Sequence, residues 1–284
     1  MSKTYLLLDC PYLCHRAFHA FQSVGMEHDG EPTGVIYGVL RDLIDLSRRY
    51  LEATIIFAWD GAGDNVRLRH CPTYKANRNR ERTPQEVSDR KKLRRQMRRL
   101  RKDVLPSLGY TNIFQADGYE ADDLIARFRF NLAYINPDAS VVIVAADKDL
   151  YQLLSDDGGQ VILYDPRKKR EYGAGDLWQE WGVRPQQWPV VKAISGCRTD
   201  NIPGIAGVAE KTACKYLTNA LGKKHKARQA MISSWPEVLN RLKLVELPYV
   251  GTPSFDLKID DVTHTKWRTV TKSLGMRSLV ELGG

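Results

Sequence analysis

The stretch "TYLLLD", residues 4–9, is one of three short apolar runs that each end in an aspartate, and these runs decide the fold. The other two are "TIIFAWD" (54–60) and "SVVIVAAD" (140–147). Unbroken runs of aliphatic and β-branched residues are typical of strands buried on both faces of a sheet. Amphipathic stretches at 35–51 and 122–132 lie between them. Strand–helix alternation predicts an α/β fold with a central, mostly parallel sheet and flanking helices.

The aspartates at the ends of these runs, Asp9, Asp60 and Asp147, are expected to converge. In open parallel sheets, ligands bind beyond the carboxyl ends of the strands. Asp149 follows Asp147 by two residues and reaches the same place if the chain turns there. A fourth run, "QVILYD", ends at Asp165, but the hairpin-like "PRKKR" follows it. We therefore leave Asp165 outside the predicted site.

A second acidic group lies in "GYEADDLIA" (118–126), where Glu120, Asp122 and Asp123 directly precede an apolar helical stretch. Carboxylates this close disfavour one another's ionisation, and burial adds to that cost. One interpretation is a helix N-terminus, whose dipole favours acidic residues in the first turn. The other is a divalent cation, which would offset the repulsion.

The composition is that of a globular protein: 43% of the 284 residues are hydrophobic and 27% are charged. This length suits one large domain or a core with a smaller module. No apolar run reaches the ~20 residues of a membrane span, and the N-terminus does not read as a signal peptide. We therefore expect a cytoplasmic protein that does not bind a membrane. The five cysteines are an odd number without a CxxC pair, which argues against a disulfide framework. "CPYLCHRAFH" (10–19) offers four zinc ligands, but their spacing matches no common zinc motif.

The positive charge is concentrated in one segment. The net charge is +9, and residues 78–102 contain twelve basic and three acidic residues, so the rest of the chain is balanced. A solvated helix face is the ordinary explanation of such a run. A block of one sign on an otherwise neutral protein nevertheless builds a field suited to a polyanion. Nucleic acid is the favoured partner, ahead of an acidic protein or a membrane surface.

Apolar residues recur through the basic segment at helical spacing, at positions 93, 97, 100 and 104. This stripe predicts a helix packed on the sheet, with the basic residues around the rest of its circumference. Thr83-Pro84 and Pro106 bracket the helix, which we interpret as an excursion from the core and not as a separate domain.

The chain changes character after Tyr172. Short helices are predicted at 174–181 and 185–194, and "IPGIAGVAEKTA" (202–213) resembles a helix–hairpin–helix. Small residues in such a turn let the backbone approach phosphates, which the amides of the next helix can bind. We therefore expect a nuclease-type core at 1–170, with the basic helical region at about 76–105, and a C-terminal helical domain at 171–284. The hairpin within that domain falls at about 196–217.

These motifs together resemble the 5′-nuclease (flap endonuclease) family, which includes bacteriophage 5′-nucleases and the 5′→3′ exonuclease domain of bacterial DNA polymerase I. The matching stretches are "LLLDCPYLCHRAFHA", "FAWDG", "VRLRHCPTYKANR", "GYEADDLIA", "ADKDLYQLL" and "TDNIPGIAGVAEKTA". The resemblance runs from Tyr5 to about Leu279. It implies a PIN-like core, a basic helical arch and a helix–hairpin–helix, in a stand-alone enzyme of a bacterium or phage.

The resemblance implies that the acidic residues hold Mg²⁺ or Mn²⁺, hard cations that prefer oxygen ligands. The first group is Asp60, Glu120 and Asp122, with Asp9 and Asp123 close by or acting through water. The second group is Asp147, Asp149 and Asp200. Two metals ~4 Å apart would orient and deprotonate a water for in-line attack on a phosphodiester and neutralise the leaving 3′ oxygen.

The resemblance also assigns roles to basic and aromatic residues. Lys75 and Arg67 match positions that stabilise charge on the scissile phosphate, and Arg78 is a further phosphate contact. Tyr74 matches an aromatic position that stacks on a displaced base. The arch, through or under which a single-stranded 5′ end passes, and the hairpin, which grips duplex backbone and often binds K⁺, supply the DNA contacts. These are Arg94, Arg95, Arg98, Arg99, Gly204, Gly207, Lys211, Thr212 and Lys215.

The implied substrates are DNA 5′ ends, nicks and 5′ flaps, recognised by structure, since phosphate contacts carry no sequence information directly. The enzyme is expected to act as a monomer in DNA replication and repair. Two departures from the family pattern stand out: Cys197 occupies a position that usually holds a second aspartate, and Gly207-Val208-Ala209 replaces Gly-Ile-Gly. They leave open a DNA-structure-binding protein with weak catalysis. A second alternative is a nuclease acting mainly on RNA primers in RNA–DNA hybrids, because the sequence does not separate RNA from DNA.

Overall fold

The computed structural model describes residues 3–78, 80–157 and 159–282. Its six-stranded sheet has the order β5-β4-β1-β6-β7-β8, and all neighbours are parallel except β7 and β8. The strands are β1 (Thr4–Asp9), β4 (Thr54–Trp59), β5 (Ile113–Gln115), β6 (Ser140–Val144), β7 (Val161–Asp165) and β8 (Arg170–Tyr172). The three apolar runs thus form the three central strands, as predicted, and β7 and β8 form the expected hairpin.

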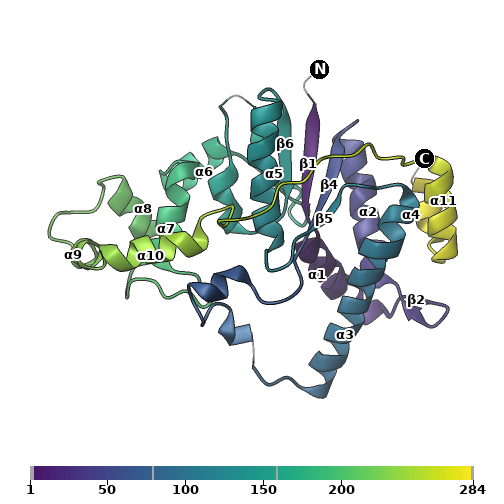
Figure 1. Cartoon of the computed structure of the whole chain (residues 1–284), viewed down its shortest axis with the longest axis horizontal. Helices are drawn as coiled ribbons and strands as arrows, with labels where there is room; N and C mark the ends of the chain where they lie inside the picture. The colour runs from purple at the N-terminus through teal and green to yellow at the C-terminus, as the bar shows by residue number, and fades with distance from the viewer. Residues whose placement is uncertain (1–2, 79, 158, 283–284) are drawn as a thin grey trace.

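Each central strand is buried on both faces, which explains why its sequence does not alternate. In β1, Tyr5 and Leu7 belong to one apolar cluster, whereas Leu6 and Leu8 belong to the other. Helix α5 (Ala121–Ile135) covers the first face. Helices α1 (Cys10–Phe21), α2 (Gly34–Arg49) and α4 (Leu105–Leu108) cover the second. These layers surround the sheet in Figure 1.

The basic segment forms helix α3 (Pro84–Arg99), which projects below the core in Figure 1. Thr83 caps it through a capping box with Glu86, and Pro84 occupies the first turn, where its missing N–H costs nothing. The sequence predicted that this helix ends before Pro106, but the helical backbone continues past Pro106 to Leu108. A π-helical turn (Leu100–Val104) joins it to α4, because Pro106 cannot donate to the carbonyl four residues earlier.

A group of short helices follows β8: α6 (Ala174–Trp181), α7 (Trp188–Ser195), α8 (Glu210–Leu217), α9 (Lys226–Ser233) and α10 (Trp235–Val245). The helix predicted at 185–194 begins as a 3₁₀ turn (Pro185–Gln187) before α7. These helices lie to the left of the sheet in Figure 1, and α7 and α10 share the apolar cluster of α5.

The last part of the chain returns to the core. An extended segment runs along the edge strand β5, where Asp261 donates its amide to the carbonyl of Gly109 at 2.9 Å and Asn112 donates its side-chain amide to the carbonyl of Lys258 at 2.8 Å. Helices α11 (His264–Ser273) and α12 (Arg277–Leu282) then pack against α4 and α2. The division that we expected at residue 170 groups these helices with the C-terminal domain, whereas in the structure they belong to the core. Among the described helices, none combines the length and apolar character that a membrane crossing requires.

Two further short strands, β2 (Glu27–His28) and β3 (Glu31–Pro32), form a hairpin between α1 and α2. This hairpin lies beside α3 and, through His28, close to Gly275 near the end of the chain.

Candidate active site

Three carboxylates stand at the carboxyl edge of the central strands, as the sequence predicted. Each is held by a backbone amide of the segment that follows or faces it. Asp9 accepts from Tyr12 at 3.0 Å, Asp60 from Ala121 at 3.0 Å, and Asp147 from Asp149 at 2.8 Å. Since Ala121 opens α5, the bond to Asp60 ties the acidic motif at 120–123 to the same edge.

Glu120 is the N-cap residue of α5, and its side chain gathers several donors. Asn65 donates to it at 2.8 Å and the Tyr74 hydroxyl at 3.1 Å, and Lys75 forms an ion pair with it. The interpretation of the motif as a helix N-terminus is confirmed, and the divalent cation stays a prediction for the carboxylates that the motif brings to the sheet edge.

The acidic residues perturb one another strongly. Burial, with the nearby carboxylates of Asp9, Asp147 and Glu120, raises the pKa of Asp122 well above its ordinary value. Burial, together with repulsion from Asp60, Asp147 and Glu120, raises the pKa of Asp9 to about 7, against the hydrogen bond from the Tyr12 amide. Shifts of this kind in a group of carboxylates are a physical mark of a functional site.

A second group lies where the 3₁₀ helix η5 (Lys148–Leu153) meets the loop after α7. One ligand atom from each of Asp149, Cys197 and Asp200 lies within 4.8 Å of the others. Burial and the charge of Asp147 raise the pKa of Asp149 to about 6, although Lys192 opposes that rise. Burial also raises the pKa of the Cys197 thiol, which lies 3.0 Å from the Thr199 hydroxyl.

The basic residues Lys75 and Arg78 reach the same place. Lys75 lies 3.5 Å from Asp200 as well as against Glu120, and Arg78 pairs with Asp200 at 3.0 Å. Burial lowers the pKa of Lys75, but the carboxylates of Glu120 and Asp200 outweigh burial and raise it. Lys75 also has a left-handed backbone, with φ of 55°, that is uncommon for a side chain of its size. Its amide donates to the carbonyl of Asp200 at 2.9 Å, which fixes this conformation.

Asp123 and Arg67 do not join the site as expected. The Arg67 guanidinium donates two hydrogen bonds to the Asp123 carboxylate, both of 2.7 Å, and a third to the carbonyl of Leu244 at 2.9 Å. Asp123 is fully buried and Arg67 is 2% exposed. This correction has a simple physical reason: each charge is already matched by the other inside the core. Asp123 is thus a partner for a buried arginine, and Arg67 is not free to contact a phosphate.

Tyr74 also differs from its expected role. Its ring is 5% exposed, packs in the core and lies beside the Arg67 guanidinium, while its hydroxyl donates to Glu120. A ring in this position cannot stack on a base. It orients Glu120 instead.

The predicted arch residues lie on α3 in two environments. Arg94 and Arg98 are exposed, and the described structure shows no ion pair for either. Arg95 pairs with Glu31 of β3, and Arg99 is half-buried. The predicted stripe holds, since Leu93, Leu100 and Val104 are buried and Met97 packs against the same cluster.

The segment between α7 and α8 is a tight turn closed by a bridge between Cys197 and Ile202. A Cβ at Gly204 would lie 2.0 Å from the carbonyl of Ser195, so glycine is needed there for packing. Gly207 is exposed with φ of 74°, which favours glycine for its conformation. Helix α8 begins without a side-chain cap, and its first turns carry Lys211, Thr212 and Lys215.

Sequence reasoning missed Lys192. It lies in α7 with only 7% exposure, 2.9 Å from Asp149 and 3.3 Å from Glu210, which also pairs with Lys148 at 3.2 Å. A single lysine inside the apolar helix "WPVVKAIS" (188–195) was the available signal, because a buried lysine requires an acidic partner.

Two excluded features stay outside the site. Asp165 accepts from the Tyr12 hydroxyl at 3.1 Å and from the amide of Arg167 at 2.9 Å, which accounts for its burial. Cys10 and Cys14 are buried in α1 within the apolar cluster of that face.

The residues present fit divalent cations. Carboxylates outnumber the lysine and arginine groups in contact with them, and the pKa values of the buried Asp9 and the partly buried Asp122 and Asp149 are raised. A narrow cavity of about 20 Å³ opens between the two acidic groups and is lined by Glu120, Asp122, Asp149 and Asp200. Oxygen-rich sites of this kind suit Mg²⁺ and Mn²⁺.

Comparison with known proteins agrees with this geometry. Residues 4–182 match the family model of the 5′-3′ exonuclease N-terminal resolvase-like domain. The chain is 36% identical over 225 residues to DNA polymerase I of Mycobacterium tuberculosis, covering 76% of this chain and 23% of that protein. It is 34% identical over 212 residues to the thermostable DNA polymerase I of Thermus aquaticus, covering 75% of this chain and 23% of that protein. The chain thus spans about a quarter of the length of these relatives.

Among solved structures, the fold is similar to that of T5 5′-exonuclease with bound zinc, with a TM-score of 0.71 and 22% identity over 99% of this chain and 100% of that one. It is equally similar to a bacteriophage T5 flap endonuclease in a pseudo-enzyme-product complex with DNA and metal ions, with a TM-score of 0.71 and 21% identity over 99% of each chain. At this level of identity the likeness establishes the fold.

Proposed function

The chain belongs to the 5′-3′ exonuclease family, and on that premise we propose that it is a structure-specific 5′ nuclease that hydrolyses phosphodiester bonds in DNA. The observation that carries this proposal is the convergence of two acidic groups, with Lys75 and Arg78, at the carboxyl edge of the sheet beside the basic helix α3. The proposed substrates are 5′ ends, nicks and 5′ flaps. The proposed place of action is the cytoplasm of a bacterial or phage-infected cell, where such DNA occurs.

We propose that Asp9, Asp60, Glu120 and Asp122 hold one divalent cation, Mg²⁺ or Mn²⁺. Asp147, Asp149 and Asp200 would hold a second, beside Cys197. When bound, such ions supply charge neutralisation at a phosphate and make water more acidic. The raised pKa values of Asp9 and Asp122 support this assignment, because a cation would relieve the repulsion that raises them.

Lys75 and Arg78 are the residues proposed to act on the substrate phosphate. The raised pKa of Lys75 keeps its ammonium charged at neutral pH, and its pinned backbone limits how far it can move. Arg78 has a side chain that is 56% exposed, so it can contact a phosphate from the solvent side. Charged donors fixed before the reaction stabilise developing negative charge without reorganisation.

Two further residues are positioning residues in this proposal. Tyr74 holds Glu120 through its hydroxyl. Arg67 holds Asp123 and the first turn of α5, and thereby keeps the acidic motif against the sheet edge.

The exposed basic residues of α3 and the uncapped start of α8 indicate a path for the DNA. We propose that a single-stranded 5′ end passes along α3, where Arg94 and Arg98 are exposed, and that the duplex backbone contacts the turn at 201–215 and the uncapped start of α8. Free amides at a helix start bind phosphate oxygens. A K⁺ ion in that turn and action as a monomer belong to the same proposal.

The test is a 5′-labelled flap duplex incubated with Mg²⁺, Mn²⁺ or EDTA. We expect cleavage near the flap junction with either metal and none in EDTA, with a matched 3′-flap duplex left intact. Tight binding of the flap without cleavage in either metal would instead support the DNA-binding alternative. An RNA flap on the same duplex tests the alternative of a nuclease acting mainly on RNA primers, which preferential cleavage of RNA would favour.

A further inference from the structure

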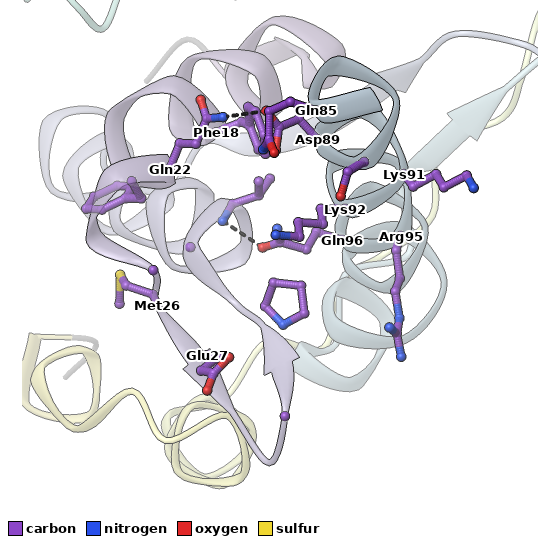
Figure 2. Close-up of a pocket in the computed structure, with 17 residues that line it drawn as sticks. Phe18, Gln22, Met26, Glu27, Gln85, Asp89, Lys91, Lys92, Arg95 and Gln96 are labelled. Atoms are coloured by element: carbon purple, nitrogen blue, oxygen red, sulfur yellow. Dashed lines mark hydrogen bonds between the residues drawn. The ribbon is translucent and has the colours of Figure 1, made fainter. Parts of the chain in front are cut away.

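A cavity of about 490 Å³ lies on the side of α3 that faces the core, away from the acidic groups. Its walls are the end of α1, the β2–β3 hairpin, the start of α2 and the inner face of α3, and none of the carboxylates of the active site lines it. Its volume falls in the range of about 300–1,000 Å³ that small-molecule sites occupy. Figure 2 shows the side chains around it.

One wall carries a buried amide with a spare donor. Gln96 is 4% exposed, and its Oε1 accepts from the amide of Val35 at 2.8 Å. Among the residues that the structure describes, its Nε2 has no hydrogen-bond partner. The nitrogen is not among the enclosed polar atoms of the described structure, so it can donate a hydrogen bond to an acceptor on a ligand in the cavity.

The opposite wall is apolar and aromatic. Phe18 and Phe21 of α1 line it, together with Met26 and Pro32. Phe21 is fixed by an edge-on contact with Tyr37, with ring centroids 5.3 Å apart. Flat apolar surface opposite a hydrogen-bonding amide suits a planar ring with a polar edge.

Charged residues of both signs line the mouth of the cavity. Two polar links join α3 to the core beside the cavity: Gln22 donates to Asp89 at 2.8 Å, and Arg95 pairs with Glu31. The ion pair with Glu31 offsets the charge of Arg95, whereas Asp89 keeps its negative charge, because Gln22 and Gln85 are neutral donors. Lys92 lies between them in Figure 2 and has no ion pair within the described structure, while Lys91 points away from the cavity. Lys92 therefore has an ammonium available for a phosphate, and Glu27 and Asp89 are the acidic residues of the same lining.

We propose that this cavity holds one nucleotide of the unpaired 5′ strand, with its base between Phe18 and Gln96 and a phosphate at Lys92. The inference rests on the proposed function, because it needs a single strand running along α3. The cavity opens beside that basic helix, whose residues between 85 and 96 form one of its walls. Such a contact tolerates any sequence, because every base has an apolar face.

The experiment is an abasic scan read by binding. A 5′-flap duplex with a labelled flap of ten nucleotides is titrated with protein in EDTA, where no cleavage occurs, and one abasic nucleotide is moved along the flap. We expect roughly five- to hundredfold weaker binding when the abasic nucleotide occupies one particular position, the loss typical of one base–aromatic contact. Elsewhere along the flap, its effect should be small.

Two matched variants keep the test specific. Ser88→Trp fills the cavity from α3, whereas Val87→Trp places the same side chain on the neighbouring residue, which is exposed and does not line the cavity. We expect Ser88→Trp to bind an intact flap as weakly as the wild type binds the critical abasic flap, and to lose all dependence on position. Val87→Trp should retain the wild-type profile. Thermal unfolding shows whether both variants are folded.

The outcomes separate this inference from the proposed function. If the wild type cleaves flaps but its binding shows no sensitive position, the nucleotide pocket is wrong and the nuclease assignment stands. A competition experiment adds free deoxynucleoside monophosphate, or an unlabelled oligonucleotide, to the complex with the labelled flap. If the two compete equally well, the cavity is a small-molecule site and our assignment to the strand is wrong. If one flap position is sensitive to the abasic change but the protein cleaves no flap, the nucleotide pocket is supported and the proposed nuclease activity is wrong.

Discussion

Asp123→Asn removes one charge from the buried pair with Arg67 while keeping the size and shape of the side chain. The carboxylate accepts four hydrogen bonds: two of 2.7 Å from Arg67, one of 2.9 Å from the amide of Tyr249 and one of 3.1 Å from the amide of Glu120. An asparagine can accept only through one oxygen, and its NH₂ group faces donors. Arg67, which is 2% exposed, would then lack its counterion.

The magnitude follows from burial. Breaking a buried ion pair by removing one partner costs about 3–5 kcal/mol, because the remaining charge stays in the interior. Unfolding entropy of about 2.1 cal/mol/K per residue gives about 0.6 kcal/mol/K for 284 residues, so Tm should fall by about 5–8 °C. The measurement is thermal unfolding followed by circular dichroism without added metal.

The neighbouring Asp122→Asn is the matched control, because it changes the adjacent residue of the same motif. Asp122 lies among carboxylates that raise its pKa, so neutralising it should leave Tm unchanged or higher. At a temperature where both variants are folded, Asp123→Asn should still cleave flaps in a Mg²⁺-dependent reaction. An unchanged Tm together with a loss of Mg²⁺-dependent cleavage in Asp123→Asn would refute our reasoning and return Asp123 to the metal site.

Four other expectations concern the site and the DNA path. Asp122→Asn should lower flap cleavage by about 10²-fold or more, the scale of losing one fixed electrostatic contact, and retain flap binding; wild-type turnover would contradict the metal assignment. Arg94→Gln with Arg98→Gln should reduce the slope of log affinity against log salt concentration for single-strand binding by about 0.7 per lost contact. The control, Arg268→Gln with Lys272→Gln on α11, should not change this slope. If the α3 variant and the wild type have equal slopes, the basic residues of α3 are a solvated face without a role in binding. Burial and neighbouring charges raise the pKa of Asp9 to about 7 and of Asp149 to about 6. The folded protein therefore holds more protons than the unfolded chain between about pH 4 and 7, and its stability without metal should fall as pH rises through that window. Mg²⁺ should raise Tm more at pH 8 than at pH 5.5, and an equal rise at both pH values would count against these carboxylates as ligands. Cys197→Asp should lower the Mg²⁺ concentration for half-maximal cleavage, because it puts a hard oxygen beside Asp149 and Asp200. Cys197→Ser is the control. If the Mg²⁺ titration curves of Cys197→Asp, Cys197→Ser and the wild type are identical, this residue lies outside the metal shell.

The sheet and its acidic edge were predictable because they depend on local patterns. Apolar runs such as 54–59 are too continuous for a half-exposed strand, and parallel order then brings their ends together whatever the rest of the chain does. The basic helix was predictable for the same reason, since its Thr83 cap and its apolar stripe both lie between residues 83 and 104.

The features that the sequence did not reveal depend on contacts between distant residues. Lys192 forms an ion pair with Asp149, 43 residues earlier in the sequence, and no local pattern around either residue predicts the other as its partner. The return of α11 and α12 to the core depends on the extended segment that pairs with the edge near Asn112, and an extended segment without strong periodicity leaves little trace in a sequence. The burial of Arg67 could not be predicted for the same reason, because its partner Asp123 is 56 residues away.

The division of labour within the acidic motif could have been inferred from helical geometry alone. Successive residues of an α-helix point about 100° apart, so Asp122 and Asp123 cannot face the same ion once both lie in the first turn of α5. Glu120, at the cap, still has an extended backbone and turns its side chain toward Lys75. Asp122 then faces the carboxylates of the sheet edge, and Asp123 faces the core, where only a buried cation can offset its charge. Three adjacent acids are tolerated because each meets a different source of positive charge: the donors around the helix cap, a metal ion in our proposal, and Arg67.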